Sequence, residues 1–146
     1  MNNEPANYKQ TQLSRVRGQA SEEFFASRYH SWIENEDQQL LSPTLDRGWD
    51  YMIEKNGIKI QVKRFNPIGK NRNQNQVKLK RTRTASGNYT DDAWDYLVVH
   101  DITNDNLIVS DVAKCLNKEG KMKTSVSVYP TSRGKGLTDL GFEVFK

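Results

Sequence analysis

Residues 49–63 decide the fold of this chain, and they read WDYMIEKNGIKIQVK. Polar and apolar side chains alternate over residues 49–53 and again over residues 58–63, which is typical of half-buried strands. Asn56 and Gly57 stand between the two stretches and are a strong signal for a two-residue hairpin turn. The sequence therefore predicts two antiparallel strands joined by a tight turn.

The alternation also predicts which side chains of this hairpin meet. Side chains two residues apart on a strand share a face, so Ile60 and Val62 point to one face while Gln61 and Lys63 point to the other. Asp50 lies near the start of the preceding strand, at a matching distance from the turn. We therefore expect an acid, an amide oxygen and an ammonium group to converge on one side of the hairpin.

This combination of groups suits hydrolysis of a phosphodiester. Such a reaction needs a metal ion to neutralise charge and activate water, and a cation near the developing charge. Mg²⁺ prefers oxygen ligands, usually one or two carboxylates with waters and substrate phosphate. Asp50 supplies a carboxylate and Lys63 the cation, but Gln61 offers only a neutral carbonyl. A further acid is therefore expected.

A helix predicted over residues 14 to about 35 offers that acid. Helical spacing places one stripe of side chains on the buried face, namely Glu22, Phe25, Tyr29, Trp32 and Ile33. An acid on an apolar stripe is costly unless it is paired or binds a metal, whereas Glu23 points about a quarter turn away, toward solvent. We therefore prefer Glu22 to Glu23. Asp46, in the loop before the hairpin, is the rival of Asp50.

The motif Gly18-x-x-x-Glu22, then Asp50, then Gln61-x-Lys63, resembles the PD-(D/E)XK nuclease superfamily over residues 17 to about 100. This superfamily includes restriction enzymes, Holliday junction resolvases and some homing endonucleases. The resemblance implies an α/β (α+β) fold in which a mixed central β-sheet is flanked by helices, as in a restriction-endonuclease-like core. It places the Glu on an amino-terminal helix, and it identifies residues 94–99 as a later core strand.

Two departures from the commonest motif narrow the resemblance. Trp49 stands where the motif has proline, and Gln61 replaces its usual acid. A glutamine at this place is similar to the branch of homing endonucleases associated with group I introns. That branch implies a site-specific, metal-dependent double-strand DNA endonuclease with Mg²⁺, or another hard divalent ion such as Mn²⁺, as cofactor. Metal ligands would then be Glu22, Asp50 and Gln61, with Lys63 completing the catalytic set.

Other functions stay open at this point. A Holliday junction resolvase shares the motif but recognises branched DNA, and a non-catalytic DNA-binding protein could keep the same fold. RNA is a weaker alternative substrate. Because a double-strand break needs two active centres and this chain has one, we expect a homodimer or homotetramer acting on double-stranded DNA.

Basic residues are concentrated in one part of the chain. Between Lys55 and Arg83 there are ten Lys and Arg residues and no Asp or Glu, although the net charge is only +4. Cations can contact phosphates, and the interleaved amides can read base edges. Residues 64–90 are therefore expected to form a basic DNA-binding insertion; a solvated charged loop is the alternative. The expected DNA contacts are Lys59, Arg64, Lys70, Arg72, Asn73, Gln74, Asn75, Gln76, Lys78, Lys80, Arg81 and Arg83, with Arg133 and Lys135 from a small basic loop.

Length and composition restrict the remaining possibilities. With 146 residues and 16.9 kDa, residues 1–146 are expected to form a single nuclease domain, with residues 1–12 as a flexible arm. A lone Cys115 excludes an intramolecular disulfide and a cysteine zinc site, and it reads as a buried apolar side chain. No apolar run approaches a membrane span. We expect a soluble cytoplasmic protein, bacterial or phage-encoded, with no membrane partner.

The remaining elements are predicted more coarsely. A short strand or turn is expected near Leu40, Leu41 and Leu45. Buried strands are expected over residues 94–101 and 107–109 with a tight turn at 103–106, and a further strand over residues 124–130. Residues 76–83 predict either a strand or an extended arm. A short helix is expected over residues 111–117, with Ser110 as its cap.

Overall fold

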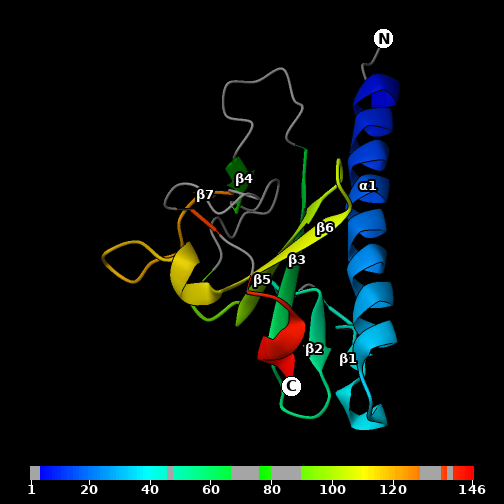
Figure 1. Cartoon of the computed structure of the whole chain (residues 1–146). Helices are drawn as coiled ribbons and strands as arrows, with labels where there is room; N and C mark the ends of the chain where they lie inside the picture. Colours follow the sequence, from blue (N-terminus) through cyan, green and yellow to red (C-terminus); the bar gives the residue numbers. More distant parts are fainter. Residues whose placement is uncertain (1–3, 46–47, 67–75, 80–89, 129–135, 138–139) are drawn as a thin grey trace.

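A five-stranded mixed sheet forms the centre of the protein (Figure 1). The computed structural model describes residues 4–45, 48–66, 76–79, 90–128, 136–137 and 140–146, with side chains from residue 12 onward. The strand order is β1-β2-β3-β5-β6, formed by Leu40–Leu41, Tyr51–Ile53, Lys59–Phe65, Tyr96–Asp101 and Asn106–Asp111. β3 and β5 run parallel and the other neighbours are antiparallel. The predicted mixed sheet is confirmed.

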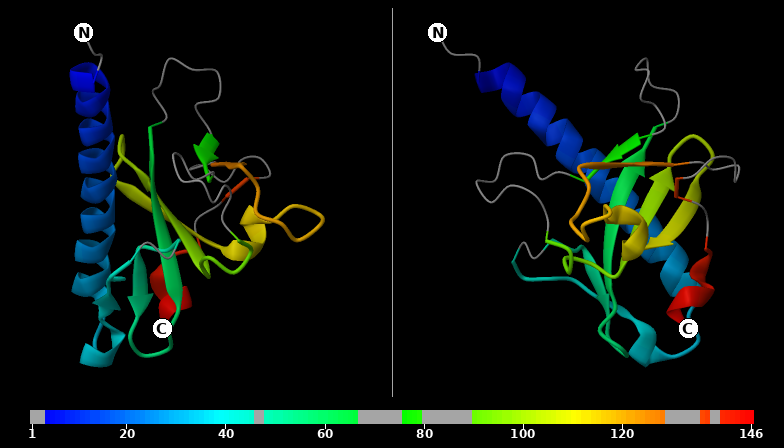
Figure 2. Two further views of the ribbon diagram at one scale, coloured as in Figure 1. Left: turned by 180° about the vertical axis from the view of Figure 1, so that it is seen from behind. Right: turned by 90° about the vertical axis from the view of Figure 1, so that its left-hand side faces the viewer.

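The two faces of this sheet are covered by different structures. One face carries the long helix α1, Glu4–Trp32. The other face is covered by a small two-stranded sheet of β4, Gln76–Lys78, and β7, Ser125–Ser127 (Figure 2). The rest of the described helical structure is 3₁₀: η1 at Glu36–Gln38, η2 at Val112–Cys115 and η3 at Phe142–Phe145. Within the described residues, the expected flanking by helices is met by α1 on one face, while a β-ribbon covers the other.

Helix α1 begins ten residues earlier than predicted. It starts at Glu4, so residues 4–12 are helical and do not form the expected arm, and it ends at Trp32. Pro5 falls in the first turn, where a missing N–H costs nothing. No Gly or Pro interrupts the chain between residues 6 and 17, so the helix can continue without a break. Among the described residues, no helix has the length and apolar character needed to cross a bilayer.

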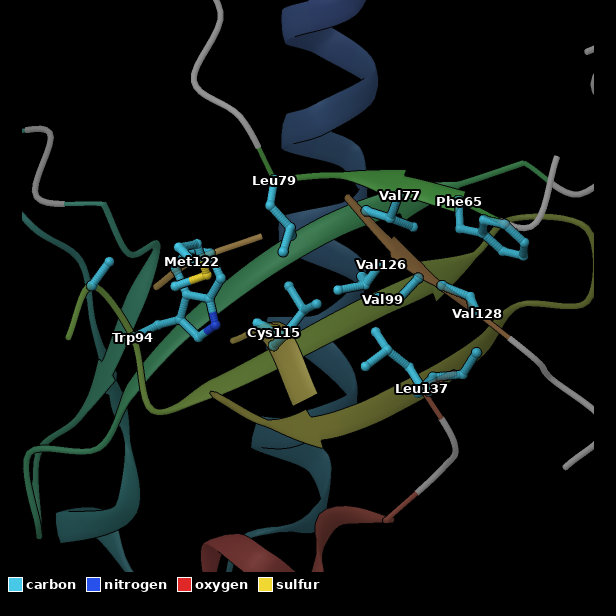
Figure 3. Packing of buried hydrophobic residues seen from close by; sticks show 13 residues of the cluster. Phe65, Val77, Leu79, Trp94, Val99, Cys115, Met122, Val126, Val128 and Leu137 are labelled. Atoms are coloured by element: carbon cyan, nitrogen blue, oxygen red, sulfur yellow. The ribbon is translucent and has the colours of Figure 1, made fainter. Parts of the chain in front are cut away.

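Each face of the central sheet has its own apolar core. Toward α1, β3 and β5 contribute Ile60, Val62 and Val98, which pack with Phe25 and Tyr29 of the helix. Toward the β4–β7 ribbon, the buried cluster contains Phe65, Val77, Trp94, Leu97, Val99, Cys115, Val126 and Leu137 (Figure 3). Successive residues of one strand therefore enter opposite cores, because side chains alternate across a sheet.

The β2–β3 hairpin has a longer loop than predicted. The Ile53 N–H donates to the Ile58 oxygen at 2.9 Å, so residues 54–57 form the loop and the predicted two-residue turn is wrong. Gly57 adopts φ 72°, and the Asn56 side chain accepts the Ile58 N–H at 3.1 Å. The pairing is displaced by two residues from the predicted one. A shift of two leaves every side chain on its predicted face.

Most of the remaining predicted elements agree with the structure. The strands expected over residues 94–101 and 107–109 form as β5 and β6, although β5 begins only at Tyr96. Residues 40–41, expected as a short strand or turn, form β1, and the turn near residue 104 has Asp105 at φ 52°. Residues 76–78 form a strand of the ribbon, and β7 occupies the centre of the predicted 124–130 strand. The helix predicted at 111–117 is a 3₁₀ turn whose N-cap is Asp111, because Ser110 is buried within β6.

Candidate active site

Helix α1 presents Glu22 to the body of the protein and Glu23 to solvent. The neighbours Ser21 and Phe25 are buried, Glu22 is partly buried and Glu23 is exposed. The preference for Glu22 over Glu23 therefore agrees with the structure. It follows from the 3.6-residue period, since positions 21, 22 and 25 share the side of the helix that packs on the sheet.

Asp50 is held against the edge of β3 just before β2 begins. Its backbone N–H donates to the Ile60 oxygen at 2.8 Å, and its carboxylate oxygen Oδ2 accepts the Val62 N–H at 2.8 Å. In the register of β2 with β3, Tyr51 lies opposite Ile60 and Met52 opposite Lys59. Beyond these residues, the Asp50 side chain takes the place of a strand partner for Val62. Two main-chain hydrogen bonds thus fix the position of this carboxylate.

Glu22 and Asp50 form a carboxyl pair. The pKa of Glu22 is raised to about 8, first by burial, then by the negative charge of Asp50 and a side-chain hydrogen bond to it, and then by the charge of Glu23. The positive charge of Lys63 acts in the opposite direction. Near neutral pH, Glu22 therefore keeps its proton and shares it with the Asp50 carboxylate. These interactions bring the predicted residues Glu22, Asp50 and Lys63 together.

Tyr51 lies next to this carboxyl pair, although no motif in the sequence singled it out. Its pKa is raised to about 12 by burial, with smaller contributions from the charges of Glu22, Asp50 and Glu23. Its ring lies 6.0 Å from that of Phe25. Tyr51 therefore forms a wall of low polarity beside the carboxyl pair. Its position directly after Asp50 is the signal that could have identified it.

Gln61 and Lys63 occupy alternate positions of β3. Gln61 is 6 % exposed and Lys63 is half-buried. Both share the strand face of Phe65, toward the β4–β7 ribbon, while Val62 between them faces α1. Gln61 is also next in sequence to Val62, whose N–H holds Asp50. The structure thus places Gln61 in the strand segment that carries the site.

The site offers oxygen donors suited to a hard metal ion. If Glu22 and Asp50 were both ionised, the charge of Lys63 would balance only one of them. The proton that Glu22 keeps removes the remaining negative charge. A divalent cation would satisfy the same deficit, so the residues fit such an ion. No cluster of three or more His, Cys, Asp or Glu side chains able to hold a metal occurs in the described part of the chain. Gln61, on the adjoining segment of β3, is the neutral oxygen donor that the sequence suggests for such an ion.

The expected DNA-contacting residues are distributed over several places. Lys59 lies at the start of β3, where its ammonium donates to the Asp92 oxygen at 2.9 Å and its N–H donates to Asp95 at 2.8 Å. Gln76 and Lys78 are exposed on β4. Outside the described residues lie Lys70, Arg72, Asn73, Gln74, Asn75, Lys80, Arg81, Arg83, Arg133 and Lys135, as well as Asp46.

Arg64 has a basic neighbour that the sequence did not indicate. The pKa of Arg64 is lowered by burial and by the positive charge of Arg17 on α1. The two residues are brought together by the helix packing: Ser21, one turn after Arg17, contacts His100, which is the β5 partner of Arg64. Two guanidinium groups so placed favour an anion between them.

A polar chain from buried Ser21 and His100 to exposed Asp105 connects α1 to the sheet next to Glu22. Ser21 Oγ lies 2.9 Å from His100 Nδ1, and His100 Nε2 lies 3.1 Å from Asp105 Oδ1. Phe24 stacks on the imidazole at 4.2 Å. A hydroxyl, an imidazole and a carboxylate in this order could suggest a nucleophile, but Ser21 is only 2 % exposed and cannot reach a substrate. These three side chains therefore position α1 on the sheet and do not react with a substrate.

Cys115 also has no catalytic character. It is fully buried, and burial raises the pKa of its thiol to about 11. The thiolate, which is the reactive form, is therefore scarce at neutral pH. The expectation of a buried, inert cysteine agrees with the structure.

Comparison with known proteins adds one result. No protein-family model matches the sequence, and no curated protein matches it. Among solved structures, a bacterial homing endonuclease, I-Ssp6803I, superposes with a TM-score of 0.58 at 19 % sequence identity, covering 83 % of this chain and 81 % of that one. At this identity the likeness concerns the fold, and the chain is therefore similar in fold to a bacterial homing endonuclease.

Proposed function

We propose that this protein is a metal-dependent endonuclease of the PD-(D/E)XK type that hydrolyses phosphodiester bonds in double-stranded DNA. The observation that carries the proposal is the Glu22–Asp50 carboxyl pair beside Lys63 at the edge of β3. The similarity in fold to a homing endonuclease supports it, as does the basic, acid-free sequence between Lys55 and Arg83. Site-specific cleavage of the homing type is the finer form of the proposal.

Each residue of the site has a distinct role in this mechanism. Glu22, Asp50 and the amide oxygen of Gln61 would hold Mg²⁺ or a similar hard divalent ion. When bound, such an ion activates water and neutralises phosphate charge. Asp50 is oriented by the Val62 N–H, so its free rotation is lost before substrate arrives. Lys63, whose positive charge acts on Glu22, would stabilise the charge that develops on the phosphate.

Arg17 and Arg64 would bind a backbone phosphate near the reacting one. They lie on α1 and β3, the two elements that also carry Glu22 and Lys63. Their mutual repulsion is relieved when an anion binds between them, which favours phosphate over an empty site. The strand would thus be fixed on one side of the metal site.

Cleavage of duplex DNA with and without metal tests the proposal. We expect the wild-type protein to cut a supercoiled plasmid with Mg²⁺ and to be inactive with a chelator. Asp50→Asn and Lys63→Ala should abolish cutting, whereas Lys55→Ala, which removes an exposed hairpin-loop lysine, should not. Cutting that survives in chelator, or in both site variants, would contradict the proposal and indicate a contaminating nuclease.

Two further substrates separate the alternatives. A random duplex library should yield a preferred sequence if cleavage is site-specific. Selective cutting of a four-way junction without sequence preference would instead identify a Holliday junction resolvase. Salt-sensitive binding of duplex DNA with no cutting of any substrate would identify a non-catalytic DNA-binding protein, and competition by duplex RNA would reveal an RNA substrate.

A further inference from the structure

The β4–β7 ribbon has one buried face and one exposed polar face. Val77 and Val126 pair in register and point into the core against the central sheet (Figure 3). Their neighbours along each strand must point the other way. These neighbours define the outer ribbon face, which consists of Gln76 and Lys78 from β4 with Ser127 and Ser125 opposite them on β7.

A hollow adjoins the outer ribbon face along β7. Its volume is about 310 Å³, and it is lined by Ser125 and Ser127 together with Lys114 of η2 and Lys123. Leu137 borders it on the far edge, where its N–H donates to the Ser127 oxygen at 2.8 Å. Hydroxyl groups and ammonium groups therefore surround the same space.

The charge of this surface is of one sign. Among the described residues of the outer ribbon face and the hollow, Lys78, Lys114 and Lys123 are basic and none is acidic. Both strands come from stretches without acids, residues 55–83 and 120–138. A surface that only kept the protein soluble would be expected to carry both signs, since acids make up 18 of the 146 residues.

We propose that the outer ribbon face and its hollow form a groove-reading surface for duplex DNA, with Gln76, Ser125 and Ser127 contacting base edges and the three lysines contacting phosphates. The major groove admits a two-stranded β-ribbon. Gln bonds to adenine, and serine hydroxyls donate or accept at several bases. This inference rests on the proposed function, because it assigns the part of the molecule that selects the site to be cut.

The phosphate contacts are tested by the salt dependence of binding. An Asp50→Asn background prevents cutting, and binding to a labelled random-sequence duplex is measured by fluorescence anisotropy over a range of KCl concentrations. Replacing Lys78, Lys114 and Lys123 by Ala should lower the salt slope by roughly three and weaken binding to all sequences alike. Replacing the same residues by Arg should restore the slope.

The base contacts are tested by selecting preferred sequences from a random duplex library. Gln76→Ala should relax the preference at a single base pair by about tenfold or more, while Ser125→Ala and Ser127→Ala should alter neighbouring positions. These residues are partly or fully exposed and lie outside the catalytic set, so the variants should melt like the wild type. Lys55→Ala is the matched control for the lysine variants.

The outcomes distinguish this inference from the proposed function. A lysine variant that matches Lys55→Ala in slope and affinity, or unchanged preferences in all three polar variants, would overturn the inference while leaving nuclease activity in place. If the wild type binds duplex DNA, with the expected changes of slope and preference in the variants, and yet cuts nothing, this result would support the inference and contradict the proposed nuclease activity. If inorganic phosphate binds at the three lysines without weakening duplex binding, the hollow is a site for a small anion, and the inference is overturned.

Discussion

At the scale of single residues, the proposed chemistry depends on a carboxyl pair whose negative charge is only partly compensated. Glu22 has a raised pKa because it is partly buried next to Asp50, and Lys63 compensates only part of the charge. If Gln61 completes the ligand set as proposed, its neutral amide adds no third negative charge. A divalent ion would therefore bind to two acids that are held ready for it, one of them by the main chain of β3.

Glu22→Gln is expected to lower the cleavage rate roughly a hundredfold or more, because it removes a charged metal ligand and its place in the carboxyl pair. Glu23→Gln is the matched control, since it is exposed and changes the same charge one residue away. Its rate should stay within a fewfold of the wild type at saturating Mg²⁺. Equal losses in both variants, measured as single-turnover rates, would contradict the assignment of Glu22.

The same pKa predicts how stability depends on pH without metal. Glu22 has a folded pKa of about 8 against an ordinary value of 4.5, so between these values the folded chain keeps a proton that the unfolded chain releases. Its favourable contribution is therefore complete below pH 4.5 and is lost as the pH rises to about 8. After allowance for solvent screening, we expect the free energy of unfolding to fall by ~1–2 kcal/mol over this pH range.

Thermal melts in chelator at pH 5 and pH 8 measure this effect. Glu22→Gln should be more stable than the wild type at pH 8, and the difference should shrink toward pH 5. A constant difference across this range would show that Glu22 ionises normally in the folded protein.

At the scale of elements, the β2–β3 hairpin and helix α1 position the two acids. The predicted pairing of the two strands is wrong by two residues, but each side chain still lies on its predicted face because side chains alternate with a period of two. Gly57 permits its loop by adopting φ 72°, whereas Gly18 lies in the helix with open space around it. The two glycines therefore differ in what they contribute.

Gly57→Ala should destabilise the protein by about 1 kcal/mol, because an alanine at positive φ is strained. Gly18→Ala should instead stabilise it by ~0.5–1 kcal/mol through helix propensity, since an added methyl group meets no atom within 4 Å. Chemical denaturation of both variants checks the opposite signs. Two changes of the same sign would contradict the role given to the loop.

The Ser21–His100 contact should matter more than an ordinary helix serine. Ser21→Ala leaves a buried imidazole nitrogen without its partner and should cost ~1–3 kcal/mol. Ser31→Ala on the same helix is the control, because this exposed hydroxyl only donates to the Arg28 oxygen and its loss should be close to neutral. A similar free energy of unfolding in both variants would show that the polar chain does not hold α1.

At the scale of the whole molecule, the residues that the structure describes contain a single proposed active site, so one copy would cut a single strand. A break in both strands needs two such sites in opposite orientation, so we expect a homodimer or homotetramer on DNA. Light scattering of the Asp50→Asn protein with duplex DNA should give a mass of at least two chains per duplex. One chain per duplex, together with nicked plasmid as the sole product, would contradict a symmetric assembly.

The sequence by itself determined what depends on short-range periodicity. It predicted the faces of the β2–β3 hairpin, the choice of Glu22 over Glu23 and the later strand pair, because a period of two or 3.6 residues is set within each element. It missed the true start of α1, since helix ends depend weakly on local residues, and it gave the turn at residues 56–57 too short a loop. These errors affected the lengths of the helix and the loop, but not the faces on which the side chains lie.

Only the tertiary structure decided which distant segments meet. The pairing of β4 with β7, the approach of Arg17 to Arg64 and the contact of Ser21 with His100, 79 residues apart, have no local signal. They follow from packing two apolar cores on opposite faces of one sheet. The two acids of the carboxyl pair could be predicted because each lies at a defined place within its own element, whereas the proposed groove-reading surface exists only once two distant strands pair.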